Sequence, residues 1–432
     1  MAELSTSKNM DLFNVFAILI TLTAVFSFLN VVYIKLPSTV GVMLASLISS
    51  LVIITSGYLG FGGIDWAIKL VEAADFNHLV MNGLLSFLLF AAASRVNISD
   101  LKEYKWTIAY LATVGIIIST ILIGFTLHWL FSLFGKDFPL IYAIIFGAII
   151  SPIDAVVVLK LLKQVNASQS LETTITGESL FNDAVAVVLF VFLVAVAGGD
   201  AQFAGADIVR FFIKEALGGL FLGLFFGYLA HRMILKIFKE GSNNHIVIVL
   251  ITLALVSGAY TVAELLDVSG PLTSVVAGLF LAKSRSHRPD DEAATHVRYV
   301  HDFWDVIDEV LNALLFVLIG LEVLVLNFQK TFLAGCILVI PVTIIARYVS
   351  VEVPLIFLRF FRKLPSLKGF VMTWCGLRGG VSIALALSLP NSQERDVVIV
   401  LTYVVVVFSV FVQGLTLGRV INWVKSKEHR TK

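Results

Sequence analysis

Five ionisable residues stand inside long apolar runs of the sequence: Asp154, Glu178, Asp183, Arg347 and Arg378. Placing such a group in the middle of a lipid bilayer costs at least about 2.5–3.5 kcal/mol, so each one needs a partner or a function. One interpretation is structural, in which ion pairs tie helices together, and we favour it for Glu178 with an arginine. The other interpretation, which we favour for the two aspartates, is an exchangeable ion site.

Asp154 follows Pro152 by two residues, in the stretch Ser-Pro-Ile-Asp. Proline lacks a backbone N–H donor and disfavours helical geometry in the residue before it. We therefore predict a helix break here, which would leave backbone carbonyls, such as that of Ile153, free to help coordinate an ion.

Asp183 follows Ser179 by four residues, so both side chains project from one face of a helix. Glu178 and Asn182 form a second such pair on the neighbouring face. Carboxylate, hydroxyl and carbonyl oxygens suit a hard cation such as Na+ or Li+ and argue against a transition metal. The predicted Na+ site consists of Asp154, Asp183 and Ser179, with Asn182 and Ile153 beside it.

Competition between a proton and a cation is the chemistry that this site could perform. Burial disfavours the charged form of a carboxylate, a second carboxylate nearby does so further, and a bound cation has the opposite effect. The same oxygens can therefore hold either a proton or a cation near neutral pH. Arg347 and Arg378 would offset part of the negative charge, and a pair between Glu178 and Arg347 would leave Asp154 and Asp183 exchangeable.

The elements that position these residues must be membrane helices. The 432 residues are 58% hydrophobic and 14% charged, with a mean hydropathy of +0.95, which excludes an ordinary soluble protein. The net charge of +1 gives no indication of nucleic-acid binding. A hydrocarbon layer about 30 Å thick needs about 20 apolar residues per helix.

Runs of that length predict a single all-α membrane domain over residues 1–432, with about 13 transmembrane helices and no soluble domain. Their approximate limits are 11–34, 37–57, 78–97, 104–132, 138–161, 172–198, 206–236, 245–266, 269–283, 303–326, 331–358, 368–389 and 397–422. Most of the 31 Lys and Arg residues fall in alternate loops on one side. This charge bias predicts a multi-pass cell-membrane protein with a cytoplasmic C-terminus and an external N-terminus.

Two of these helices are predicted to be discontinuous. The fifth is interrupted at Ser151-Pro152, and the twelfth at residues 376–380, which read Gly-Leu-Arg-Gly-Gly. The two runs are seven crossings apart and therefore cross in opposite directions. This is the arrangement of inverted repeats, in which two broken helices cross at the midplane and frame an ion site.

The motifs resemble one family along essentially the whole chain. The strongest match is Gly-Glu-Ser-Leu-Phe-Asn-Asp-Ala-Val at residues 177–185, preceded by Ser-Pro-Ile-Asp-Ala at 151–155. Further matches are residues 269–272 and 276–279, 315–320, Ala346-Arg347 and residues 376–379. In this combination the sequence resembles the sodium/proton antiporters that include bacterial NhaP and the mammalian NHE exchangers.

The resemblance implies a homodimer that exchanges Na+ or Li+ for H+ and serves pH homeostasis, with no cofactor besides the transported ions. It implies a dimerisation part at about 11–97 and 206–326, interleaved with an ion-binding core at about 78–198 and 303–422 that moves as an elevator. Asp154, Asp183 and Ser179 would bind the cation, Glu178 would pair with Arg347, and Arg378 would compensate charge at the helix crossing. The pair Asn182-Asp183 implies electroneutral exchange.

Three alternatives remain at this point. A K+/H+ antiporter of the same fold would use the same site. An intramembrane aspartyl protease also places two aspartates on different helices, but it needs a Gly-x-Gly-Asp context that neither aspartate has. The acids Asp302, Asp305, Asp308 and Glu309 open the tenth predicted span, where they either complement the helix dipole or form a negatively charged mouth.

Overall fold

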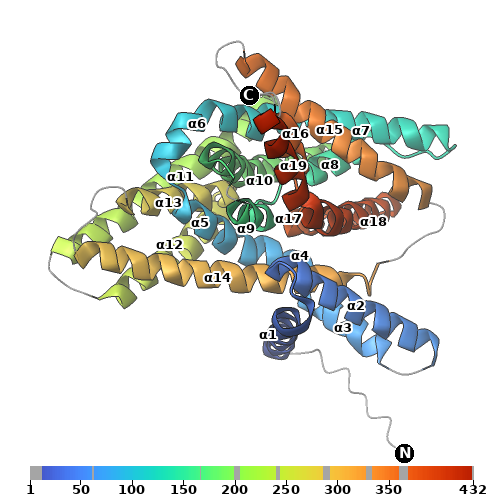
Figure 1. The fold of residues 1–432 in the computed structure, drawn as a ribbon, viewed down its shortest axis with the longest axis horizontal. Helices are drawn as coiled ribbons and strands as arrows, with labels where there is room; N and C mark the ends of the chain where they lie inside the picture. The colour runs from blue at the N-terminus through green and yellow to red at the C-terminus, as the bar shows by residue number, and fades with distance from the viewer. Residues whose placement is uncertain are drawn as a thin grey trace, which may run out of the picture.

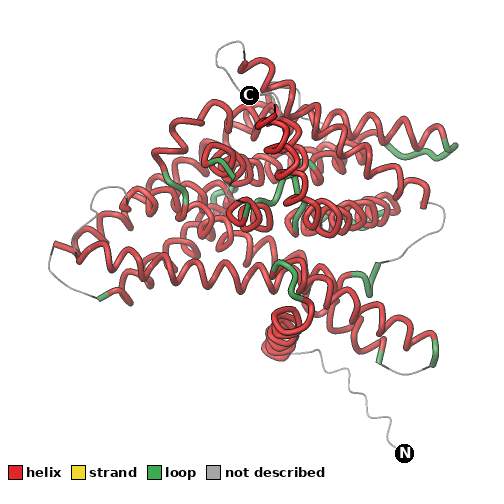
Figure 2. The backbone as a smooth tube through the Cα atoms, in the orientation of Figure 1, coloured by secondary structure: helices red, strands yellow, loops and turns green. Residues whose placement is uncertain are grey.

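The computed structural model describes residues 12–60, 63–165, 167–198, 205–239, 244–285, 292–326, 333–359 and 368–430. Within these ranges the backbone forms helices joined by loops, and no strand occurs in them (Figure 2). The predicted all-α fold is therefore confirmed.

The helices are labelled in Figure 1. Those of the first half are α1 (Leu12–Leu29), α2 (Ser38–Tyr58), α3 (Ile64–Ala74), α4 (Phe76–Leu79), α5 (Leu85–Arg95), α6 (Ile98–Tyr110), α7 (Ile116–Leu133), α8 (Leu140–Ile150), α9 (Val156–Gln164) and α10 (Gln169–Ala197). Those of the second half are α11 (Gly205–Lys239), α12 (His245–Leu265), α13 (Gly270–Arg285), α14 (Glu292–Glu322), α15 (Leu333–Arg359), α16 (Lys368–Trp374), α17 (Gly380–Leu387), α18 (Gln393–Phe408) and α19 (Gly414–Arg430). Short π-helical turns stand at Asn30–Ile34, Val80–Leu84, Leu111–Gly115 and Ser409–Gln413.

Many of these helices have the length and composition of membrane spans. Among the described residues, eight helical stretches are long and apolar enough to cross a bilayer, and three shorter apolar helices accompany them. Large apolar side chains on their outer surfaces are exposed, such as Phe221 and Phe225 on α11 and Ile345 on α15, and in a membrane such surfaces face lipid. The count of about 13 crossings stays a prediction, because breaks divide several of the predicted spans into shorter helices.

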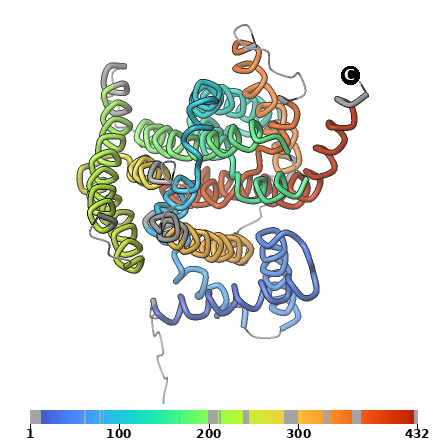
Figure 3. Tube along the Cα trace, turned by 60° about the vertical axis from the view of Figure 1, so that its left-hand side comes forward, coloured from blue at the N-terminus to red at the C-terminus, as the bar shows by residue number. Residues whose placement is uncertain are grey.

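The helices pack in two sets. In the first, which we call the α14 set, α14 packs on α1, α2, α5 and α12, and α13 packs on α5, α11 and α12. In the second, the α10 set, α10 packs on α6 and α8, α7 on α8 and α15, α18 on α8, α15 and α17, and α9 on α19. Figure 3 shows α14 next to the blue helices α1 and α2 on one side of the molecule. The two sets meet where α14 touches α17 and where α10 touches α11 and α13.

Close backbone packing holds α7 against α8 within the α10 set. A Cβ atom at Gly124 would stand 2.8 Å from the Cα of Ile144, and one at Gly147 would overlap the carbonyl oxygen of Thr120. Small residues at such contacts let two membrane helices approach at backbone distance, which is a main source of packing energy in lipid. α8, whose C-terminal end leads to Asp154, is thereby fixed to its neighbour.

Both predicted helix breaks are present. α8 ends at Ile150 and α9 begins at Val156, while α16 ends at Trp374 and α17 begins at Gly380. Pro152 accounts for the first break and the glycines at 376, 379 and 380 for the second. The two unwound segments touch, because the backbone N–H of Asp154 donates to the carbonyl of Leu377 at 2.7 Å.

Two helical segments differ from the sequence-based prediction. α3 was not predicted, because a helix of 11 residues is too short to cross a bilayer; it buries Ala67, Leu70, Val71 and Ala74 on one face, the pattern of an amphipathic helix. α14 begins at Glu292, so the helix starts well before the apolar run predicted at 303–326. Charged residues ended the apolar run there, but they do not end a helix.

Candidate ion-binding site

Asp154 lies in the unwound segment between α8 and α9. Its Oδ1 accepts a hydrogen bond from the backbone N–H of Val156 at 2.8 Å, so the carboxylate satisfies one of the N–H groups that have no partner within α9. Its own N–H is held by Leu377 on the opposite broken helix. Gly379 also lies against this carboxylate, where a Cβ atom would overlap Oδ2. These contacts hold the Asp154 carboxylate in one position. The space that it occupies is available because Gly379 has no side chain.

Ser179 and Asp183 come from one face of α10, as the spacing predicted. The Ser179 hydroxyl donates to the carbonyl of Ile153 at 3.0 Å and accepts from the N–H of Ala155 at 3.2 Å. The hydroxyl therefore forms hydrogen bonds with the residues on both sides of Asp154. Asp183 stands one helical turn further along and is close enough to Asp154 for their charges to interact.

A cavity of about 450 Å³ brings these groups together. Its lining includes Ile153, Asp154, Ser179, Asp183 and Gly379. The lining continues to exposed side chains at one end of the α10 set, so the cavity opens in that direction. The lining thus supplies two carboxylates and a hydroxyl, the oxygen donors that a hard monovalent cation needs.

Glu178 and Arg347 form a buried ion pair beside the cavity. Arg347 donates from Nη1 to Oε1 of Glu178 at 2.5 Å and from Nη2 to Oε2 at 3.0 Å. Glu178 is only 1% exposed and Arg347 5%. This two-point geometry, with both charges out of solvent, neutralises Glu178 within the α10 set.

Arg378 lies in the second unwound segment and reaches the first. Its Nη1 donates to the carbonyl of Ser151 and, at 2.9 Å, to the carbonyl of Pro152, while its backbone N–H donates to the hydroxyl of Ser409. Carbonyls at the end of a helix have no partner within it and carry the negative end of the helix dipole. The guanidinium therefore stabilises the C-terminal end of α8.

Asn182 is buried next to the site. Its side chain is 1% exposed, and its Oδ1 has no hydrogen-bond partner among the described residues. Four residues after Glu178 on the same helix, it supplies an uncharged polar group next to Asp183.

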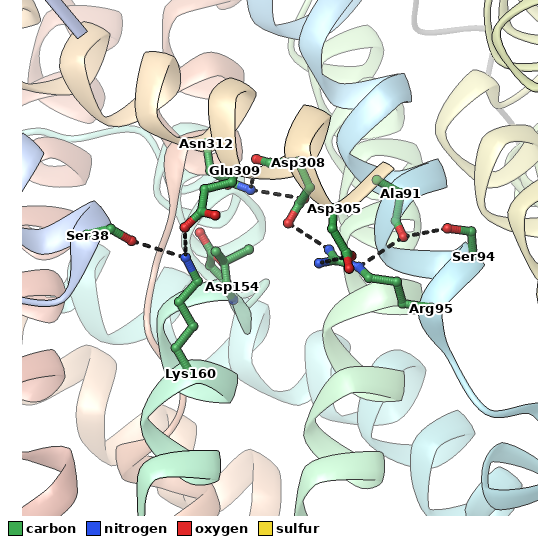
Figure 4. Close-up of polar contacts among 11 residues, drawn as sticks. Ser38, Ala91, Ser94, Arg95, Asp154, Lys160, Asp305, Asp308, Glu309 and Asn312 are labelled. Carbon is green, nitrogen blue, oxygen red and sulfur yellow. Dashed lines mark hydrogen bonds and ion pairs between the residues drawn. The ribbon is translucent and has the colours of Figure 1, made fainter. Parts of the chain in front are cut away.

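Four polar residues around the cavity escaped the sequence reasoning or were discounted by it. They are Arg95 on α5, Lys160 on α9, and Asp308 and Asn312 on α14, and all four line the cavity (Figure 4). Arg95 binds Asp308 at 2.7 Å and Asp305 at 3.4 Å, and Asn312 donates to Asp308 at 3.0 Å.

Asp308 lies at the centre of this group. It is 7% exposed and close enough to Asp154 for their charges to interact. The interpretation that these acids complement the dipole at the start of a helix is wrong, because they lie in the middle of α14. Only the alternation of acids with apolar residues along a long helix could have indicated that one of them faces inward.

Comparison with known proteins supports the expectation drawn from these motifs. Residues 15–423 match the family described as "Sodium/hydrogen exchanger, transmembrane". The Na(+)/H(+) antiporter NhaP of Pseudomonas aeruginosa is 40% identical over 412 residues, which cover 94% of this chain and 95% of that protein. The Na(+)/H(+) antiporter NhaH of Halobacillus dabanensis is 33% identical over 362 residues, covering 82% of this chain and 84% of that protein.

A solved structure has the same fold. The sodium proton antiporter MjNhaP1 of Methanocaldococcus jannaschii, at pH 8, superposes with a TM-score of 0.74 at 19% sequence identity, covering 95% of this chain and 98% of that one.

These matches decide between the classes of function that the sequence left open. The family consists of transporters rather than enzymes, so the aspartyl protease alternative is wrong. The chain is a multi-pass membrane protein with the antiporter fold, as predicted. It belongs to the sodium/hydrogen exchanger family.

Proposed function

We propose that this chain exchanges Na+ or Li+ for H+ across the membrane, through competition of cation and proton for Asp154 and Asp183. The observation that carries the proposal is their convergence, with Ser179, in the lining of one cavity. Two carboxylates whose charges interact favour a bound positive charge, which either a proton or a cation supplies. The relatives that match over most of the chain are named as Na(+)/H(+) antiporters.

Exchange is proposed to be electroneutral. The charge of Glu178 is matched by Arg347, so that pair adds nothing to the exchangeable charge. Asn182 adds none either. If one Na+ replaces one proton on the Asp154 and Asp183 pair, the loaded site carries the same charge in both directions of transport.

Alternating access is proposed to occur by an elevator movement of the ion-binding core. The side chains that hold the ion all belong to the α10 set, which packs beside the α14 set with the cavity between them. A sliding movement of one set would carry the ion without dismantling its ligands. A homodimer built through the part that stays still, an external N-terminus and a cytoplasmic C-terminus complete this proposal.

Proton flux in proteoliposomes tests the proposal. Na+, Li+ and K+ are added in turn to vesicles that contain the native chain, Asp183→Asn or the matched control Asp65→Asn, which changes an exposed aspartate on α3. We expect the native chain and the control to exchange Na+ and Li+ for protons, and Asp183→Asn to be inactive. Normal exchange by Asp183→Asn would show that the site is misassigned.

Two further outcomes separate the finer parts of the proposal. Proton flux driven by K+ at least as well as by Na+ would favour the K+/H+ alternative. Exchange rates that rise steeply with an imposed membrane voltage would contradict electroneutrality, since moving one net charge changes the free energy by about 2.3 kcal/mol per 100 mV.

A further inference from the structure

Lys160 reaches across the mouth of the cavity. It lies on α9, and its Nζ donates to Oε1 of Glu309 on α14 at 2.7 Å and to the hydroxyl of Ser38 on α2 at 3.1 Å (Figure 4). The Lys160 side chain is 43% exposed and that of Glu309 is 65% exposed. The ammonium group therefore binds both partners where the cavity meets solvent.

These hydrogen bonds join the two sets of helices. α9 packs on α10 and α19 in the α10 set, whereas α14 and α2 pack on each other in the α14 set. Lys160 is six residues beyond Asp154, in the middle of α9, the short helix whose first backbone N–H donates to the Asp154 carboxylate. Any movement of the ion ligands relative to α14 has to lengthen or break the contact between Lys160 and Glu309.

The neighbouring ion pair of Arg95 differs in this respect. Arg95 extends from α5 to Asp305 and Asp308 on α14, and both helices belong to the α14 set. It would stay intact during a relative movement of the two sets. The cavity rim thus carries one ion pair between the sets and another within a single set, a few residues apart on α14.

The charges at the rim explain why the bond of Lys160 to Glu309 suits an open cavity. An ammonium group beside a cation route repels entering cations unless a carboxylate neutralises it. Lys160 is also near enough to Asp308 for their charges to interact. With Glu309 bound, the positive charge of Lys160 is balanced at the rim.

We propose that Lys160, with Glu309 and Ser38, is a latch that holds the α10 set against the α14 set while the cavity is open, and that releases when the ion-binding helices move. The latch rests on the alternating access proposed above. Because the pair is exposed, it favours the latched state over the released state by only a small free energy. An exchanger needs both states to be populated, so this preference must be small enough to reverse.

Dipolar electron paramagnetic resonance measures this bias directly. In a background with Cys336 and Cys375 replaced by alanine, spin labels are attached at Gln164→Cys on α9 and Val306→Cys on α14, two exposed positions in different sets. The reconstituted chain should give two distance populations. Loss of a partly exposed ion pair shifts such a ratio by about 1.5- to 5-fold.

We expect Lys160→Gln and Glu309→Gln each to lower the population of the state described above by that factor. The charge-swapped double variant, Lys160→Glu with Glu309→Lys, should restore the native ratio. The matched control, Arg95→Gln, removes the pair within the α14 set and should leave the ratio unchanged. Each variant must elute as a folded, monodisperse species.

Two results would overturn the latch. One is a ratio that is the same in the native chain, Lys160→Gln and Glu309→Gln. The other is a single distance in the native chain and in all variants, which would show that α9 and α14 do not move relative to each other. Proton flux by the same labelled samples separates these results from failure of the antiport itself, because absence of Na+-driven flux in the native chain refutes the proposed function instead.

Discussion

Removing one partner of the buried pair between Glu178 and Arg347 should destabilise the fold far more than removing both. In Arg347→Met, the Glu178 carboxylate stays 1% exposed with its two guanidinium hydrogen bonds gone. Nη2 of this arginine also donates to the carbonyl of Met372, at 3.4 Å. A buried charge left without its partner costs about 3–5 kcal/mol.

This cost can be converted into a melting temperature. The entropy of unfolding is about 2.1 cal/mol/K per residue, or about 0.9 kcal/mol/K for 432 residues, so the loss corresponds to about 3–6 °C. Glu178→Met should lose a similar amount, because it leaves the guanidinium buried. The double variant, with two methionines, should lie within about 2 kcal/mol of the native chain, since neutral side chains of similar size often replace a buried pair at little cost.

Tryptophan fluorescence during heating in detergent measures the four proteins of this cycle. A single variant that melts within about 1 °C of the native chain would contradict this cost. So would a shift of the double variant that equals the sum of the two single shifts. Additive shifts would mean that the two groups do not depend on each other, whatever the distance between them. Exchange by the double variant would also show that this pair is structural.

Three further predictions concern the ion ligands. Gly379→Ala should weaken apparent Na+ affinity at least tenfold in a flux titration, because its Cβ would overlap the Asp154 carboxylate. The control Gly418→Ala should match the native chain, because its Cβ meets only a side-chain carbon at 3.9 Å. Ser179→Ala should weaken Na+ affinity about 2- to 10-fold, since each hydrogen bond contributes about 0.5–1.5 kcal/mol, and Ser179→Thr should retain most of it. Acidification should raise the Na+ concentration for half-maximal exchange by up to tenfold per pH unit, because one proton competes with one cation; a pH-independent value would contradict competition.

Much of the site was predictable because its signals are local. The proline at 152 and the three glycines at 376–380 stand inside apolar runs, and both breaks were found at those positions. Proline alone is not sufficient, since α15 stays helical through Pro341 and Pro354. The four-residue spacing of Ser179 and Asp183 determines a shared helix face before any neighbour is known. Buried charges such as Glu178 and Arg347 are likewise easy to identify, because the residues around them in the sequence are apolar.

The rim of the cavity could not be predicted in the same way. Lys160 and Glu309 are 149 residues apart, and both side chains lie on exposed helix surfaces, where a charge needs no special explanation. Their meeting depends on how two sets of helices pack, which no local pattern encodes. The long polar start of α14 had a related cause, since hydropathy detects lipid contact and not helix formation.

The hydrogen bond from the N–H of Asp154 to the carbonyl of Leu377 is made by peptide groups alone. Substitutions at either position, except proline at 154, leave both atoms in place. The joint between the broken helices can therefore persist while the side chains around the ion change. A library that varies those side chains to alter ion preference can therefore retain the backbone contact between the two unwound segments.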